Sequence, residues 1–148
     1  MNPIIRKGKR NDLPSVYNYV KELAIFEKEP AAVTATLDDY YRAHDEKLIM
    51  THIAELNGKC IGIALYYMTF STWKGHMLYL EDFYVDINYR SSGVGQLLFD
   101  AYIAEAKKLN CKMVKWAVLD WNKKAVKFYE RNNATIEKCW WDCKIIFE

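Results

Sequence analysis

The stretch MLYLEDFYVDINYRSSGVGQLLFDAYIAEAKKL, residues 77–109, decides how this chain is expected to fold. Its first ten residues, 77–86, are rich in Leu, Tyr, Phe and Val, which favours a β-strand. From Gly93 to about Leu109 the apolar residues recur with the period of an amphipathic helix. A strand that passes through a glycine-containing turn into a helix is therefore the expected centre of the fold.

The sequence on either side predicts a mixed α/β domain with the element order β-α-α-β-β-β-α-β-α-β-β. Asn57-Gly58 is the dipeptide that a type I′ hairpin turn favours, and Thr36 with Asp39 resembles a capping box at a helix start. Strands are expected at 4–6, 48–56, 59–70, 77–86, 113–119 and as a final pair within 134–147, and helices at 13–24, 36–44, 93–109 and 122–131. No repeat, low-complexity tract or linker interrupts this order, so a single domain over residues 1–148 is expected.

The composition limits the classes of protein to which the chain can belong. With 148 residues, of which 51% are hydrophobic and 15% aromatic, the chain can bury a sizeable core. The formal net charge is +2 and the basic residues are scattered, which argues against a nucleic-acid partner. The N-terminus lacks the apolar core of a signal peptide, and no segment approaches the roughly 20 apolar residues of a membrane span. We therefore expect a cytoplasmic protein with no membrane partner.

The cysteines and histidines do not form a metal-binding pattern. Neither a C-x-x-C pair nor a cluster of the two residue types occurs, so no metal is expected. The residues concerned are Cys60, Cys111, Cys139, Cys143, His44, His52 and His76. Buried free thiols are the expected state of the cysteines.

The turn before the expected helix at Gly93 has the chemistry of an anion site. The first N–H groups of a helix lack partners within the helix and carry partial positive charge, and glycines let a phosphate approach the backbone closely. Arg90 and the two serines after it add a charge and hydroxyl groups. The spacing fits neither a P-loop nor a Rossmann fingerprint, because no Gly-Lys-Ser/Thr occurs and Leu98 replaces the third glycine. A phosphate-bearing cofactor of another kind is indicated.

Glu81 and Asp82 stand next to each other a few residues before that turn. Because side chains alternate along a strand, the two carboxylates are expected to face opposite sides of the sheet. Only one of them would then face a substrate that binds on one side of the strand.

Residues 89–99, YRSSGVGQLLF, resemble the R-x-x-G-x-G acetyl-CoA signature of the GNAT N-acetyltransferase superfamily, and the element order matches that fold. More narrowly, four segments are similar to the diamine (spermidine/spermine) and thialysine N-acetyltransferase family. These are VKELAIFEKE (20–29), ALYYMTFSTW (64–73), MLYLEDFYV (77–85) and DWNKKAVKFYERNNA (120–134). The similarity covers most of the chain.

The resemblance implies that strand 77–86 splays from strand 113–119 and that acetyl-CoA, the co-substrate, places its pantetheine arm in the gap. The arm would pair with backbone groups of the first strand, and its pyrophosphate would lie on the turn. The implied cofactor-binding residues are Phe83, Tyr84, Val85, Arg90, Ser91, Ser92, Gly93, Val94, Gly95, Gln96, Asn122, Lys123, Lys124 and Ala125.

The resemblance also implies an enzyme that acetylates a primary amine by direct attack in a ternary complex. Tyr129 matches the family's tyrosine acid for the leaving thiolate, and Glu81 its base, acting through water with Asp82 as a second contact. The implied substrate is a small cation, a diamine, polyamine or lysine-like amino acid. Its implied binding residues are Phe26, Glu27, Trp73, Glu81 and Asp82. A homodimer is the expected assembly.

Other functions remain open at this point. The acceptor can instead be an antibiotic amine or a protein or peptide amine, and the domain can be a regulatory module that binds CoA without turnover. Glu81 and Tyr129 argue against the last alternative, because a binding module needs neither an acid nor a base. Asn133 stands where the family commonly has a glycine after its last helix, and asparagine tolerates the left-handed conformation expected there.

Overall fold

The computed structural model describes residues 1–147, which fall into two compact units. The first unit comprises residues 1–117 and the second begins at Val118. A single acetyltransferase domain over residues 1–148 stays a prediction.

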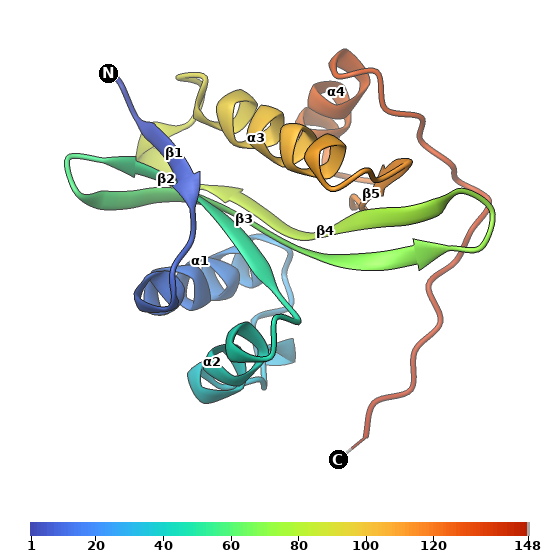
Figure 1. Cartoon of the computed structure of the whole chain (residues 1–148), viewed down its shortest axis with the longest axis horizontal. Coiled ribbons are helices and arrows are strands. Elements are labelled where there is room, and N and C mark those ends of the chain that lie inside the picture. Colours follow the sequence, from blue (N-terminus) through green and yellow to red (C-terminus); the bar gives the residue numbers. More distant parts are fainter. Residues whose placement is uncertain (148) are drawn as a thin grey trace. The chain divides into compact units, whose positions relative to one another are not determined.

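The first unit is built on one mixed sheet of five strands in the order β1-β2-β3-β4-β5 (Figure 1). The first four strands pair antiparallel with their neighbours, whereas β5 runs parallel to β4. The mixed α/β class predicted from the sequence is confirmed. The strands are β1 (Ile4–Lys7), β2 (Met50–Leu56), β3 (Lys59–Ser71), β4 (Gly75–Val85) and β5 (Met113–Lys115).

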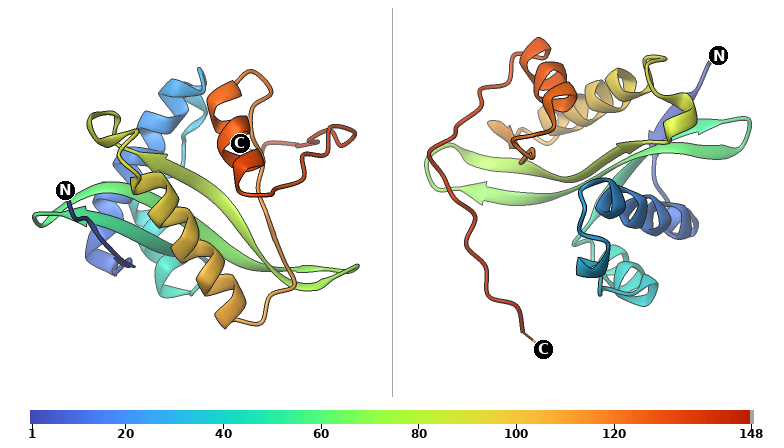
Figure 2. Two further views of the ribbon diagram at one scale, coloured as in Figure 1. Left: turned by 90° about the horizontal axis from the view of Figure 1, so that it is seen from above. Right: turned by 180° about the vertical axis from the view of Figure 1, so that it is seen from behind.

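Helices cover both faces of this sheet. In Figures 1 and 2, α1 (Leu13–Phe26) and α2 (Leu37–Asp45) lie on one face and α3 (Val94–Lys108) on the other. Two buried clusters fill the spaces between the layers. The α1 cluster contains Val16, Tyr19, Val20, Ile53, Ile63 and Leu65, and the α3 cluster contains Ala54, Ile61, Val94 and Leu98. Three short 3-10 helices complete the unit, at Arg10–Asp12, Pro30–Ala32 and Ile87–Tyr89.

The two local motifs expected from the sequence are present. The Thr36 hydroxyl accepts the Asp39 N–H at 3.2 Å, and the Asp39 carboxylate accepts the Thr36 N–H at 2.8 Å, so the capping box starts α2. Asn57 and Gly58 join β2 to β3 with φ of 51° and 78°, as the type I′ turn requires.

Strands β4 and β5 separate soon after they meet. Their pairing ends at Tyr79↔Lys115, although β4 continues to Val85. The strand predicted over 113–119 is thus only three residues long, and within residues 1–147 the β5 side of residues 80–85 has no strand partner. A β-bulge lies two residues beyond Tyr79, at Glu81, and a bulge bends and twists its strand. The splay expected between these strands is therefore present within the first unit.

Between residues 118 and 147 the second unit contains one helix, α4 (Lys123–Arg131). The Asn122 side chain caps its start by accepting the Ala125 N–H at 3.2 Å. Asn133 has a φ of 66°, so the expected left-handed residue after the helix is confirmed. The Ala134 N–H then bonds the Tyr129 carbonyl at 3.1 Å and closes the last turn.

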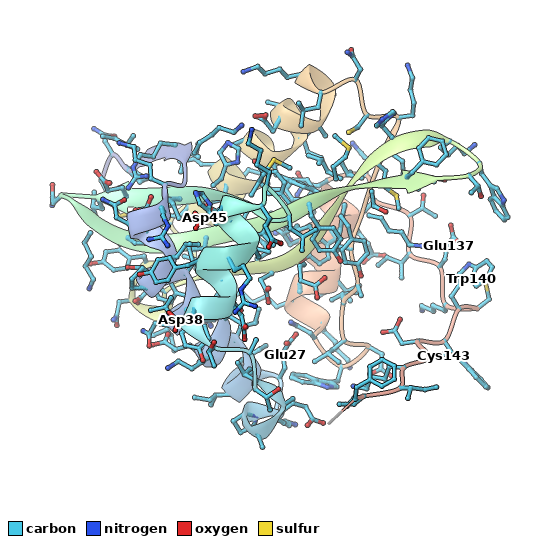
Figure 3. All side chains as sticks on the ribbon, turned by 60° about the horizontal axis from the view of Figure 1, so that its bottom comes forward. Glu27, Asp38, Asp45, Glu137, Trp140 and Cys143 are labelled. Carbon is cyan, nitrogen blue, oxygen red and sulfur yellow. The ribbon has the colours of Figure 1, made fainter. Side chains whose placement is uncertain are left out.

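The final pair of strands predicted within 134–147 is wrong for the structure of the single chain, because none of these residues is in a strand. Their aromatic and β-branched residues favour extended structure, but a strand also needs a neighbour for its backbone, and among the described residues the second unit supplies none. Several large apolar side chains are exposed as a result. They include Trp140 (69%), Trp141 (90%), Ile145 (83%) and Phe147 (90%). Figure 3 shows Trp140 near Glu137, whose carboxylate accepts its indole N–H at 2.9 Å.

All four cysteines are free thiols. Cys60 and Cys111 are partly buried, whereas Cys139 and Cys143 are exposed, so the expectation of buried thiols is wrong for the last two. They lie in the segment without regular structure, which offers no core to bury them. No helix among residues 1–147 is long and apolar enough to cross a membrane.

Candidate active site

A β-bulge at Glu81 decides where the acid pair points. Leu65 pairs with Asp82 and the next residue, Tyr66, pairs with Leu80, so Glu81 is the extra residue in β4. Leu80 lies opposite Tyr66, whose ring packs against Tyr102 of α3. Leu80 therefore faces α3.

Phe83 contacts Phe99 of α3, with ring centroids 6.2 Å apart. Leu80 and Phe83 therefore both face α3, and the two residues between them face the other side of the sheet. The prediction that Glu81 and Asp82 face opposite sides is wrong, because the bulge breaks the simple alternation on which it relied. Both carboxylates lie on the face covered by α1 and α2.

The surroundings of the acid pair come from three other elements. Tyr67 of β3 donates its hydroxyl to Glu81 Oε2 at 2.9 Å. Tyr40 of α2 is close enough for both carboxylates to raise its pKa, together with burial, which is the larger cause. Glu27, labelled in Figure 3, follows α1 directly and adds a third carboxylate. No motif in the sequence singles out either tyrosine.

Burial and like charge change the proton affinity of this group. Asp82 is partly buried, and burial, followed by the charges of Glu81 and Glu27, raises its pKa from 3.8 to about 7. Burial also raises the pKa of Glu27. A carboxyl group that titrates near neutral pH can accept and release a proton under physiological conditions.

The glycine-containing turn has the geometry of an anion site. Gly93 adopts a left-handed conformation, with φ of 89°, and begins α3 without a side-chain cap. Its neighbour two residues earlier, Ser91, also has positive φ, at 60°. The first turn of α3 thus begins at a residue that supplies no side-chain cap for its N–H groups, which suits anion binding.

The two glycines of the signature have different roles in this turn. Gly93 is needed for its left-handed backbone conformation and not for lack of space, because an added Cβ would meet no described heavy atom within 4 Å. At Gly95 an added Cβ would stand 3.8 Å from Val85 and 3.9 Å from Phe83, which are ordinary contacts. Of the two glycines, only Gly93 is therefore required by its backbone conformation.

Arg90 and Ser92 are held by the protein itself. The Arg90 Nε–H donates to the Val85 carbonyl at 2.8 Å, and the guanidinium lies 4.9 Å from the centre of the Tyr84 ring. The Ser92 hydroxyl donates to the Tyr89 carbonyl. Arg90 fixes the turn to the end of β4 and leaves its positive charge at the same place, where a phosphate would gain from it.

The free edge of β4 presents only some of the expected backbone groups. The Asp86 N–H donates to the Ile61 carbonyl of the neighbouring strand at 2.9 Å. Because facing directions alternate along an antiparallel ladder, the backbone groups of Tyr84 also face β3, and those of Phe83 and Val85 face the open edge. The Val85 carbonyl is bound by Arg90 there, which agrees with this assignment.

The expected substrate-binding residues do not all come together in one chain. Phe26 ends α1 and is 41% exposed next to Glu27, and the Arg90 guanidinium lies 5.9 Å from its ring centre. Trp73 lies in the turn between β3 and β4 and is 83% exposed. The six steps of β4 from Gly75 to Glu81, at roughly 3.3 Å each, separate this turn from Glu81 by about 20 Å. Within a single chain Trp73 therefore does not line the site of the acid pair.

The remaining expected residues belong to the second unit. Tyr129 is buried on α4, and its ring contacts Phe128 with centroids 5.6 Å apart. Asn122 is the N-cap of the same helix and uses its side chain for that bond, while Lys123, Lys124 and Ala125 form the first turn. In residues 1–147 no group of three or more His, Cys, Asp or Glu side chains is placed to hold a metal ion.

Residues 13–134 match the model of the acetyltransferase (GNAT) family. The chain belongs to this family. A thialysine N-epsilon-acetyltransferase of Bos taurus is 32% identical over 145 residues, which cover 86% of this chain and 81% of the relative. The human spermidine/spermine N(1)-acetyltransferase-like protein 1 is 33% identical over 139 residues, covering 88% of this chain and 20% of that protein.

Solved structures agree on the fold of this GNAT chain. The crystal structure of an aminoglycoside acetyltransferase from an uncultured soil metagenomic sample has a TM-score of 0.82, covers 99% of this chain and 97% of its own, and is 17% identical. At that identity the similarity establishes the fold alone. The family match and the named relatives make this GNAT chain an N-acetyltransferase, an enzyme that acetylates amines.

Proposed function

We propose that this N-acetyltransferase transfers the acetyl group of acetyl-CoA to a primary amine of a small cationic substrate, a diamine, polyamine or lysine-like amino acid. The observation that carries the proposal is the bulge that places Glu81 and Asp82 on one face of the sheet, next to Glu27. Three carboxylates attract an amine that carries more than one positive charge. The thialysine enzymes among the relatives agree with this substrate class.

The cofactor site is proposed at the turn and the open edge of β4. The first N–H groups of α3, the left-handed Gly93 and the charge of Arg90 fit the diphosphate of acetyl-CoA. The open edge at Phe83 and Val85 fits an extended arm that adds to the sheet as a strand would. When bound, acetyl-CoA supplies the activated thioester. Ser91 to Gln96 complete the proposed contacts of the first unit, and a contact from Asn122 to Ala125 is proposed from the family resemblance alone.

Asp82 is proposed to take the proton from the substrate ammonium, directly or through one water. Transfer from an ammonium with a pKa of about 10.4 to an ordinary Asp is uphill by roughly 9 kcal/mol. Transfer to Asp82 is uphill by only about 5 kcal/mol, because burial and its acidic neighbours raise its pKa to about 7. Glu81, the base implied by the family resemblance, is proposed to bind the substrate cation and to maintain the high proton affinity of Asp82.

Tyr129 is proposed to donate a hydrogen bond or a proton to the leaving thiolate in a ternary complex. A phenol has a pKa of about 10 and a thiol about 8.5, so full transfer is uphill by roughly 2 kcal/mol. Stabilisation of the developing charge by the hydroxyl is the larger part of its proposed role.

A homodimer is proposed from the exposed apolar residues near the C-terminal end. A buried aromatic side chain contributes about 150–250 Å². Trp140, Trp141 and Phe147 with two isoleucines therefore approach the roughly 800 Å² that each partner buries in a stable complex. Light scattering should give twice the monomer mass, and a Trp141→Ser/Ile145→Ser variant should be monomeric. Leu48→Ser, at an exposed apolar residue between α2 and β2, is the control, and a monomeric wild type would contradict the dimer.

The catalytic proposal is tested by thiol release from acetyl-CoA over a panel of diamines, lysine analogues, aminoglycosides and peptides. We expect the highest kcat/KM with a diamine or a lysine analogue and a loss of at least tenfold in Asp82→Asn. Highest activity on an aminoglycoside or a peptide would favour the alternative acceptors. Tight binding of acetyl-CoA with no turnover of any amine would instead indicate a regulatory module.

A further inference from the structure

Tyr67 contacts the acid pair, and the family signature assigns it no role. It lies on β3 opposite Tyr79, close to the bulge in the neighbouring strand. Its ring stacks on the Tyr79 ring, with centroids 5.5 Å apart and an angle of 22° between the planes. The strand and the stacked ring hold the phenol, so its hydroxyl has a defined position when it donates to Glu81 Oε2 at 2.9 Å.

We infer that Tyr67 is a positioning residue of the active site, which holds the Glu81 carboxylate beside Asp82 on the α1 face of the sheet. Glu81 is exposed and has several rotatable bonds, so without a partner its carboxylate would sample many positions in water. The bulge brings the two acidic residues to one face, and the Tyr67 hydroxyl selects one position of the first carboxylate. The bulge and the hydroxyl thus act together.

The consequence for turnover rests on the proposed function, whereas the arrangement of groups does not. Four groups face Asp82: Glu81 from its own strand, Glu27 after α1, Tyr40 from α2 and Tyr67 from β3. The negative charge of Glu81 stabilises the protonated form of Asp82, so its effect depends on the distance between the carboxylates. When Glu81 is released into water, Asp82 should hold its proton less tightly.

The first experiment needs neither acetyl-CoA nor an amine. The carboxyl carbon of Asp82 is titrated by 13C NMR in the wild type, Tyr67→Phe, Glu81→Gln and the double variant. The wild-type pKa should be near 7, and Tyr67→Phe should lower it by about 0.5 or more, because only the hydroxyl is lost. Glu81→Gln should lower it at least as far, and Tyr67→Phe should have no further effect in that background. Tyr41→Phe on α2, whose ring contacts Arg10 instead, is the matched control and should titrate like the wild type.

An unchanged Asp82 titration in Tyr67→Phe, with a lowered one in Glu81→Gln, would overturn the inference. Thermal unfolding shows whether each variant is folded. If Tyr67→Phe does not fold, Glu81→Gln provides a second measurement, because loss of the carboxylate acceptor must change the 13C chemical shift of the Tyr67 ring carbon that bears the hydroxyl. An unchanged chemical shift at pH 7 would overturn the inference in that case.

The second experiment measures turnover and separates the two proposals. With the best amine of the panel, Tyr67→Phe should lower kcat/KM for the amine about threefold to tenfold, and the KM for acetyl-CoA should not change. The acidic limb of its pH profile should move to lower pH in parallel with the Asp82 titration. Wild-type kcat/KM and an unmoved limb would refute a role for Tyr67 in the reaction. If the wild type acetylates no amine, the proposed function fails, and the titration still decides the position of Glu81.

Discussion

The two glycines of the acetyl-CoA signature should respond in opposite directions to substitution by alanine. Gly93 has a φ of 89°, and a left-handed conformation costs a residue with a Cβ about 1–2 kcal/mol. An alanine at this position meets no described atom within 4 Å, so the whole effect is backbone strain. For a chain of 148 residues, each kcal/mol shifts Tm by roughly 2–4 °C. Gly93→Ala should therefore unfold about 2–8 °C below the wild type.

Gly95→Ala is the matched control for this prediction. Its added Cβ makes ordinary contacts at 3.8 Å and 3.9 Å, and alanine is favoured over glycine in a helix by up to about 1 kcal/mol. Gly95→Ala should thus unfold at the wild-type Tm or up to about 4 °C above it.

Acetyl-CoA binding tests the cradle itself. If the turn in Gly93→Ala relaxes to negative φ, binding must restore the strained conformation, and calorimetry should give a Kd about 5–30-fold above the wild-type value. Gly95→Ala should bind within a few-fold of the wild type. Equal Tm and Kd values for the two alanine variants would refute the reasoning, because the variants differ in strain rather than in side-chain chemistry.

Three further perturbations test other parts of the site and fold. Asp82→Asn should abolish the rise in kcat/KM through about pH 7, and an unchanged pH profile would exclude Asp82 as the base. The same variant should have a higher Tm than the wild type at pH 8, because a carboxyl group whose pKa is raised on folding destabilises the protein once it ionises. Tyr129→Phe should lower kcat at least tenfold with nearly unchanged acetyl-CoA affinity in a binding assay, and a wild-type kcat would remove the proposed acid. Gly62→Ala should lower the free energy of unfolding in urea by about 1–3 kcal/mol, because its Cβ would stand 3.0 Å from Leu98 and 3.2 Å from the Tyr84 carbonyl; wild-type stability would show that α3 can move away from the sheet.

Features set by neighbouring residues could be predicted from the sequence. The capping box at Thr36 and Asp39 and the hairpin at Asn57-Gly58 depend on chemistry within four residues, and the structure contains both. The helix after Gly93 likewise follows from a local period of apolar residues. These signals were enough to predict the fold class, which the structure confirms.

The direction of the acid pair could not be predicted in this way. Strict alternation gives opposite faces for Glu81 and Asp82, whereas the bulge depends on how Leu65 and Tyr66 pair with β4. Such a register is a property of two strands together, and the sequence of one strand does not contain it. The contact from Tyr67 was missed for the same reason.

The end of the chain shows a second limit. Residues 134–147 have the composition of strands, but composition does not supply the neighbouring strand that an extended backbone requires. Trp73 was assigned to the substrate site by resemblance to the family, yet within one chain it lies at the far end of the β3–β4 hairpin. The missing strands and the position of Trp73 both depend on how distant parts of the chain meet, which the sequence around each residue does not show.

Both carboxylates face α1 only because β4 contains one more residue than the segment of β3 with which it pairs. Deleting Leu80 would return β4 to an uninterrupted pleat and would turn Glu81 toward α3, among the aromatic rings of Phe99 and Tyr102. The composition of the strand would hardly change, but the two carboxylates proposed to bind a cation would no longer share a face. Homologues that keep two adjacent acidic residues without the extra residue of the bulge would therefore share the motif and lack the site.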